Sequence, residues 1–157
     1  MISLKSGDTA PNFTANNQNS EKISLADFKG KTLVLYFYPK DNTPGCTAEA
    51  CDLRDNFEAL KKSGFEILGV SPDSEVSHQK FIKKHNLPFD LLADTEKEII
   101  KSYGVWGEKK MFGKIKEGVF RTTFIINKDG IISEVIDKVK TKYHAAQIYP
   151  DILLMEE

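Results

Sequence analysis

The chain has 157 residues and a formal net charge of −1, from 22 basic and 23 acidic side chains. This length favours a single domain spanning 1–157 with its own hydrophobic core, and the interspersed charges offer no field that would attract nucleic acid or a membrane surface. Residues 1–8 lack the apolar run of a signal peptide and no stretch is long enough to span a bilayer, so we expect a cytoplasmic protein.

The first elements are short strands in a polar stretch, followed by a helical turn at 24–28. Residues 32–38 include the apolar run LVLYFY, which is typical of a strand buried on both faces. A helix is predicted over roughly 44–62, because Thr43 can serve as its N-cap and Pro44 suits its first position. A Ser-Gly pair ends this helix.

The next elements alternate between strand and helix. We predict a strand at 65–70, a weaker helix at 74–86, a short strand at 89–92 and a helix at 95–103. The sequence Asn-Leu-Pro ends the weaker helix, because the residue before a proline disfavours helical backbone. Strands that alternate with helices are typical of βαβ units and a parallel sheet.

The C-terminal part favours antiparallel pairing. Residues 104–120 are rich in Gly and Lys and predict a loop or an irregular hairpin. The clearest β-hairpin follows, with strands at 122–126 and 131–136 joined by the turn NKDG. A closing helix is predicted over 143–155. This order of elements is that of an α/β thioredoxin-like fold, in which helices flank a central mixed sheet.

Both cysteines of the chain lie just after the 32–38 strand. Cys46 falls in the first turn of the predicted helix, where unpaired backbone N–H groups and the helix dipole stabilise a thiolate. At about 100° per residue, Ala50 and Leu53 lie within about 40° of Cys46, so Cys46 should head the buried stripe and lie at the bottom of a pocket. The alternative is that Cys46 is a small core residue.

Cys51 lies about 140° from Cys46 on the same helix, on the polar side with Arg54 and Asp55. In one continuous helix the two Cα atoms would be about 8.5 Å apart. A disulfide needs a Cα separation of roughly 4.4–6.8 Å. A bond between Cys46 and Cys51 therefore requires the first turns of the helix to unwind, and it would report a conformational switch.

Zinc binding is a weaker alternative for the cysteines. The chain has no second cysteine pair, and His78, His85 and His144 are scattered among polar residues. We expect these histidines to be ordinary surface or edge residues.

Three stretches of the chain resemble a known family. Pro39, Thr43 and Cys46 have the spacing PxxxTxxC of the active-site signature of peroxiredoxins, thiol enzymes that reduce hydroperoxides. Residues 103–110 and 119–126 resemble two further stretches of the bacterioferritin-comigratory, or Q-type, branch and occur in the same order. The similarity covers nearly the whole chain and implies the peroxiredoxin variant of the thioredoxin-like fold.

The resemblance implies an atypical two-cysteine peroxidase. Cys46 attacks a peroxide oxygen as a thiolate and becomes a sulfenic acid, which Cys51 resolves as an intramolecular disulfide after the helix start unfolds. Thr43, Arg121 and Pro39 complete the implied site. Thr43 points its hydroxyl at the first helical turn, Arg121 brings a permanent positive charge to the sulfur, and Pro39 shapes and shields the pocket.

The resemblance also implies the partners of the reaction. The substrates are hydrogen peroxide and organic hydroperoxides, and thioredoxin or a similar dithiol protein reduces the disulfide. No metal, flavin or nicotinamide cofactor is implied, and the protein should be a monomer or a weak dimer.

Two other functions compete with peroxide reduction. A thiol-disulfide oxidoreductase fits the fold, but the chain lacks a Cys-x-x-Cys motif and has no proline before Thr122. A redox-dependent chaperone or sensor is left open by the sequence. Among the remaining residues, Glu49 is expected mainly to complement the helix dipole and is kept as an accessory candidate for the site. Trp106, Lys109 and Lys110 are expected to pack or solvate a loop.

Overall fold

The structure is a computed structural model, and it describes residues 3–154. The strands are β1 (Thr14–Asn16), β2 (Lys22–Ser24), β3 (Thr32–Phe37), β4 (Phe65–Ser71), β5 (Asp90–Ala93), β6 (Trp106–Met111), β7 (Lys114–Val119), β8 (Thr122–Ile126) and β9 (Ile132–Ile136). The helices are α1 (Pro44–Asp55), α2 (Phe57–Lys62), α3 (Glu75–His85), α4 (Glu98–Ser102) and α5 (His144–Ile148), with 3-10 segments η1 (Leu25–Phe28) and η2 (Pro150–Leu154). Among these described residues, no helix combines the length and the apolar character needed to cross a membrane.

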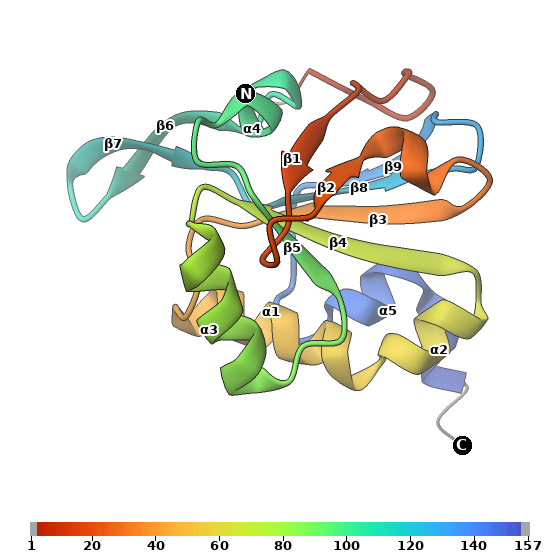
Figure 1. Ribbon diagram of the computed structural model, residues 1–157. Helices are drawn as coiled ribbons and strands as arrows, with labels where there is room; N and C mark the ends of the chain where they lie inside the picture. Colours follow the sequence, from red (N-terminus) through yellow and green to blue (C-terminus); the bar gives the residue numbers. More distant parts are fainter. Residues whose placement is uncertain (1–2, 155–157) are drawn as a thin grey trace.

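The centre of the fold is a five-stranded mixed sheet in the order β5-β4-β3-β8-β9 (Figure 1). Strands β3, β4 and β5 run parallel, whereas β8 is antiparallel to both of its neighbours. Helices α1, α2, α3 and α5 cover one face of the sheet, and α4 lies with β1 and β2 on the other (Figure 1). The predicted arrangement, a central mixed sheet flanked by helices, is confirmed.

The two faces of the sheet carry separate hydrophobic clusters, and β3 contributes to both. Successive side chains of a strand point to opposite faces. One cluster therefore contains Leu33, Leu35 and Phe37. The other contains Val34, Tyr36 and Tyr38, and Cys46 belongs to it. This arrangement explains the continuous apolar run of β3: both faces of the strand are buried.

The predicted helix over 44–62 is interrupted at Asn56. Its backbone has φ −109° and ψ 10°, and its side-chain amide donates to the carbonyl of Asp52 at 2.9 Å. Asparagine competes with the helical hydrogen bonds in this way. The prediction of one continuous helix was wrong: α1 ends at Asp55, and α2 begins at Phe57.

Two further helices are shorter than predicted. The helix predicted over 95–103 begins only at Glu98, because Lys97 has left-handed backbone with φ 60°. The closing helix predicted over 143–155 stops at Ile148, because Pro150 restricts the backbone of the preceding residue, and a 3-10 segment follows. Residue 155 lies outside the described residues.

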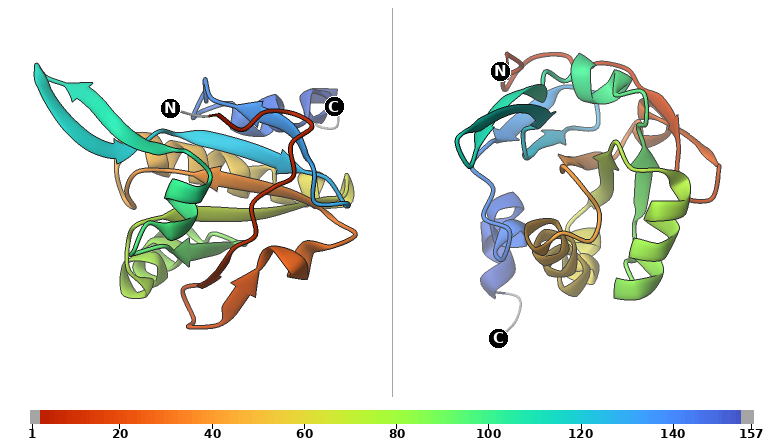
Figure 2. Two further views of the ribbon diagram at one scale, coloured as in Figure 1. Left: turned by 90° about the horizontal axis from the view of Figure 1, so that it is seen from above. Right: turned by 90° about the vertical axis from the view of Figure 1, so that its left-hand side faces the viewer.

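The segment 104–120 forms a regular hairpin in which β6 pairs antiparallel with β7 from Trp106↔Val119 onwards. This hairpin projects from the body of the molecule (Figure 2). Its turn contains Phe112 and Gly113, both at positive φ. The predicted β-hairpin at 122–136 is confirmed as β8 and β9.

We predict that Gly69→Ala destabilises the protein. A methyl group at Gly69 would lie 2.6 Å from Leu91 and 2.9 Å from the Tyr36 ring, so a buried side chain must move. Overpacking of this kind costs about 1–3 kcal/mol in the free energy of unfolding, which urea unfolding measures. Gly118→Ala is the matched control, because a methyl group there meets only Lys109, at 3.4 Å. Equal losses in the two variants would contradict the prediction.

Candidate active site

The sheet register places four of the five predicted site residues near the C-terminal end of β3. Pro39 and Thr43 lie in the loop that joins β3 to α1, and Cys46 is in the first turn of α1. Because Phe37 pairs with Thr122 on the neighbouring antiparallel strand, Arg121 stands beside the end of β3. Residues far apart in the sequence therefore meet where β3 ends and β8 begins.

Arg121 makes hydrogen bonds to two acidic groups. Its Nη2 donates to Cys46 Sγ at 3.2 Å, and its Nη1 donates to Glu49 Oε1 at 2.7 Å. The Cys46 side chain is almost fully buried, at 2% exposure. A methyl group at Gly45 would lie 3.2 Å from Arg121 Nη2, so the absence of a side chain at Gly45 permits this approach. The guanidinium thus places a permanent positive charge at the sulfur.

Glu49 is a buried partner of the guanidinium and not a surface residue that complements the helix dipole. Its side chain is fully buried. Burial raises the pKa of Glu49 to about 7, although Arg121 acts to lower it. Within residues 3–154, Glu49 Oε2 has no hydrogen-bond partner, and His144 Nε2 lies 3.4 Å away. The prediction of a mainly dipolar role for Glu49 was therefore wrong.

His144 extends this buried group from α5. Its Nδ1 donates to Gln147 Oε1 at 2.9 Å, and its Nε2 accepts from the Thr123 hydroxyl at 2.7 Å. The backbone N–H of Lys140 also donates to Gln147 Oε1, which fixes that oxygen as an acceptor. Burial and the nearby Arg121 lower the pKa of His144 to about 4, although its bond to Gln147 acts to raise it. At neutral pH a neutral imidazole therefore faces Glu49.

The Thr43 hydroxyl does not point at the first helical turn. It donates to the carbonyl of Lys40 at 2.9 Å, and no side-chain hydrogen bond caps α1. The backbone of Thr43 still occupies the N-cap position, and its carbonyl accepts from the Thr47 N–H at 2.8 Å. The prediction of a hydroxyl aimed at the helix start was wrong, because the hydroxyl turns back to the carbonyl of Lys40 in the loop.

Pro39 lines a pocket of about 290 Å³ beneath the β6–β7 hairpin. Trp106, Lys109 and Val119 form part of its wall. Burial and the nearby Arg121 lower the pKa of Lys109, whereas Cys46 acts to raise it. Lys109 therefore lies close enough to Cys46 and Arg121 to interact with their charges.

Cys51 stands apart from this group. It is half-buried, and both cysteines are free thiols. Its Sγ lies 3.8 Å from Nδ1 of His85, at the C-terminal end of α3. The structure therefore brings Pro39, Cys46 and Arg121 to one region and leaves Cys51 in another.

The comparisons with known proteins agree with this geometry. The family model described as the AhpC/TSA family matches residues 6–135. The chain belongs to the AhpC/TSA family. It is 46% identical over 156 residues to Peroxiredoxin Bcp of Bacillus subtilis, covering 99% of each chain, and 45% identical over 144 residues to Peroxiredoxin Bcp of Escherichia coli, covering 92% of each.

Solved structures extend the likeness to the fold. A peroxiredoxin Q structure from Xanthomonas campestris has a TM-score of 0.83 at 34% identity, covering 92% of each chain. A cysteine-to-serine mutant of PrxQ from Xylella fastidiosa has a TM-score of 0.89 at 32% identity over both full lengths. The resemblance to Q-type peroxiredoxins, the thioredoxin-like fold class and the thiol-dependent peroxidase activity are confirmed.

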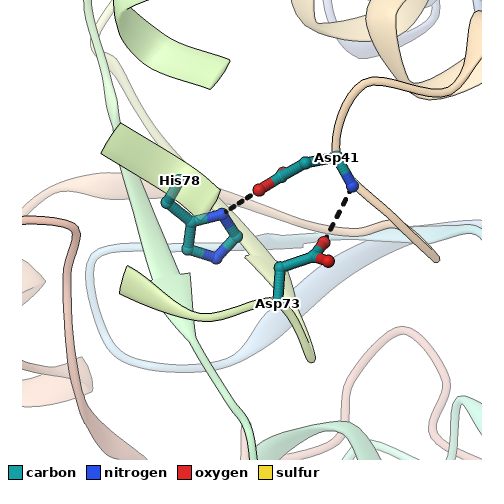
Figure 3. A group of neighbouring side chains, drawn as sticks. All are labelled: Asp41, Asp73 and His78. Atoms are coloured by element: carbon teal, nitrogen blue, oxygen red, sulfur yellow. Dashed lines mark hydrogen bonds and ion pairs between the residues drawn. The ribbon is translucent and has the colours of Figure 1, made fainter. Parts of the chain in front are cut away.

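A polar network fixes the active-site loop of this peroxiredoxin (Figure 3). His78 Nε2 donates to the carbonyl of Leu92 at 2.9 Å, and its Nδ1 lies in hydrogen-bonding contact with Asp41 Oδ2 at 2.7 Å. Asp41 also accepts from the Tyr38 hydroxyl at 2.6 Å, and its backbone N–H donates to Asp73 Oδ2 at 2.8 Å. The loop is thereby tied to α3 and β5.

Three side chains of this network, in the described part of the chain, lie close enough together to hold a metal ion. Ligand atoms of Asp41, Asp73 and His78 lie within 4.8 Å of one another in the described part of the chain. Each of these groups already takes part in the hydrogen bonds just described, so the network explains their proximity.

Two histidines that were predicted at the surface are buried. His78 and His144 are fully buried, so the prediction of surface or edge positions was wrong for both. The sequence gives little indication that His144 is buried, because only tertiary packing brings α5 to the site. For Glu49 a signal existed, because a residue three positions after Cys46 lies near the same side of a helix.

We predict that Glu49→Gln changes how stability depends on pH. The pKa of Glu49 rises from 4.5 in the unfolded chain to about 7 in the folded protein, so its contribution is fully present below pH 4.5 and is lost as pH rises through 7. Between about pH 5 and about pH 8 the variant should gain about 2–3 kcal/mol relative to the native protein, measured by urea unfolding at each pH.

Glu58→Gln is the control for this measurement, because Glu58 is exposed on α2. His144 contributes with the opposite sign, since its lowered pKa means that stability is lost as pH falls from 6.5 through about 4. It does so in both proteins and cancels in the comparison. A difference that does not change with pH would contradict the buried, raised-pKa carboxyl.

Proposed function

We propose that this peroxiredoxin reduces hydrogen peroxide and organic hydroperoxides through Cys46 and resolves the product through Cys51 in a thioredoxin-dependent cycle. One observation carries the proposal: Arg121 Nη2 donates to Cys46 Sγ at 3.2 Å in a buried site at the start of α1. A cation held at a thiol favours the thiolate, which is the nucleophilic form.

The first step is attack of the Cys46 thiolate on one peroxide oxygen. The S–O bond forms as the O–O bond breaks, giving a sulfenic acid and a hydroxide or alkoxide, which takes a proton from solvent to become water or an alcohol. Negative charge moves from the sulfur towards the departing oxygen, and donors already in place stabilise it. Arg121 and the unpaired backbone N–H groups of the first turn of α1 are the donors that support this role.

The second step is attack by Cys51. The two cysteines lie on different sides of α1, so the start of this helix has to unwind before a disulfide forms. The missing side-chain cap on α1 supports this proposal, because a cap ordinarily stabilises a helix by about 1 kcal/mol. A dithiol protein of the thioredoxin type then reduces the exposed disulfide.

A pocket of about 290 Å³ beside the loop that leads to α1 supports organic hydroperoxides as substrates. Pro39, Trp106 and Val119 line it and offer apolar surface to an alkyl chain. A Xanthomonas campestris bacterioferritin comigratory protein, 33% identical with a TM-score of 0.83, is described in a study of alkyl peroxide reduction.

Intact mass spectrometry tests the chemical sequence. After one equivalent of hydrogen peroxide, the reduced protein should become about 2 Da lighter, the mass change of one disulfide. Cys46→Ser should give no mass change, because the nucleophile is gone. A disulfide or an oxidised product in Cys46→Ser would assign the first step to another residue.

We predict that Cys51→Ser separates the two steps. The variant should gain about 16 Da with the first equivalent of peroxide and reach about 32 Da with excess, because no thiol condenses with the sulfenic acid. Turnover with thioredoxin, followed by loss of peroxide, should fall to the background of the uncatalysed reaction. Native turnover in Cys51→Ser would show that another thiol or the reductant itself resolves the sulfenic acid.

A further inference from the structure

Cys51 and His85 form a thiol–imidazole pair away from Cys46 and Arg121. The Sγ of Cys51 lies 3.8 Å from Nδ1 of His85, and both residues are half-buried between α1 and α3. This distance is within hydrogen-bonding range for sulfur. The pair joins the proposed resolving cysteine to a group that can accept a proton.

The surrounding contacts fix the position of the imidazole. Arg54 Nη1 donates to the backbone carbonyl of His85 at 2.8 Å, which satisfies one of the unpaired carbonyls at the end of α3. The His85 ring packs edge-on against Phe81, with centroids 5.3 Å apart. Asn86, at φ 52°, ends the helix immediately afterwards. The ring is therefore held towards α1 and Cys51.

The surroundings of the ring favour its neutral form, in which one ring nitrogen has a free lone pair. Burial lowers the pKa of His85, and the cations Lys84 on α3 and Arg54 on α1 lower it further. Within the described residues, His85 Nε2 is buried without a hydrogen-bond partner. The ring therefore makes its side-chain polar contact with Cys51. Arg54 places a positive charge beside Cys51.

We propose that His85 is the general base that activates the resolving thiol. This inference rests on the proposed function, in which Cys51 is the resolver. His85 Nδ1 takes the thiol proton while α1 is folded and the two atoms are in contact, and the charge of Arg54 stabilises the resulting thiolate.

The step balances without another reactant. The Cys51 thiolate attacks the sulfur of the Cys46 sulfenic acid, so that the S–S bond forms and the S–O bond breaks. Cys51 is oxidised and the sulfenic sulfur is reduced. The departing hydroxide takes a proton from solvent, and His85 returns its proton to solvent, so that one water is released overall.

This role makes His85 a determinant of overoxidation. A sulfenic acid that waits for a thiol reacts with a second peroxide and becomes a sulfinic acid. Faster formation of the Cys51 thiolate shortens that wait. The pair therefore biases the oxidised protein towards the disulfide, which a dithiol reductant can reverse.

The test is quenched-flow mass spectrometry of the full-length protein with hydrogen peroxide. Sulfenic acid formation and disulfide formation are followed as separate mass changes in the native protein, in His85→Gln and in the control Lys83→Gln, an exposed change on the same helix. His85→Gln should leave the first step within about twofold and slow the second about tenfold or more near neutral pH, with recovery at high pH as hydroxide replaces the base. Lys83→Gln should match the native protein.

The outcomes distinguish the two proposals. A native protein that never forms the disulfide would contradict Cys51 as the resolver. A native protein that forms it normally, together with an unchanged second step in His85→Gln, would overturn the role of His85 alone, as would equal slowing of both steps.

A second measurement guards against a folding defect. In a Cys46→Ser background, alkylation of Cys51 by iodoacetamide near neutral pH should be several-fold faster with His85 than with Gln at that position. Equal rates, or a faster reaction in the Gln variant, would overturn the proposal.

Discussion

The guanidinium of Arg121 is the group on which the site depends. Its planar fork donates to Cys46 Sγ through one nitrogen and to Glu49 Oε1 through another. The buried carboxyl of Glu49 orients the fork, and the second nitrogen is then directed at the sulfur. Lysine carries the same charge but has no fork, so charge alone does not reproduce this arrangement.

The fold places Arg121 beside Cys46, and it leaves the start of α1 without a side-chain cap. The register of β3 and β8 sets Arg121 beside the loop, and Gly45 lets it approach. The network of Asp41 and His78 anchors the loop, whereas α1 begins without a side-chain cap. A firm loop followed by a weakly capped helix is a combination that favours local unfolding of the helix start over loss of the whole domain.

The sequence predicted the elements whose signals are local. The apolar run of β3, the proline that begins α1 and the turn of the β8–β9 hairpin each specify structure within a few residues. The burial of Cys46 at the start of α1 followed from its place on the helix. The break at Asn56 and the end of α5 before Pro150 also have local causes, an asparagine side chain and a proline. The helical spacing of apolar residues continues past both positions, so the spacing alone predicted longer helices.

The remaining features depend on contacts between distant segments. Nothing in the neighbourhood of His144 in the sequence indicates that α5 packs it against Glu49, and the hydroxyl of Thr43 turned to Lys40 through the detailed path of the loop. The pairing of Cys51 with His85 requires α3 to end beside α1. Such placements follow from tertiary packing, which spacing along the chain does not reveal.

The most direct measurement of the role of Arg121 is the second-order rate constant for oxidation of Cys46 by hydrogen peroxide in Arg121→Lys. Loss of one preorganised donor in a buried site typically slows a reaction by about 100-fold to about 1,000-fold, and we expect a fall in that range although the charge is kept. A rate within about twofold of the native protein, in a variant of native stability, would show that the guanidinium fork is not what activates the thiol.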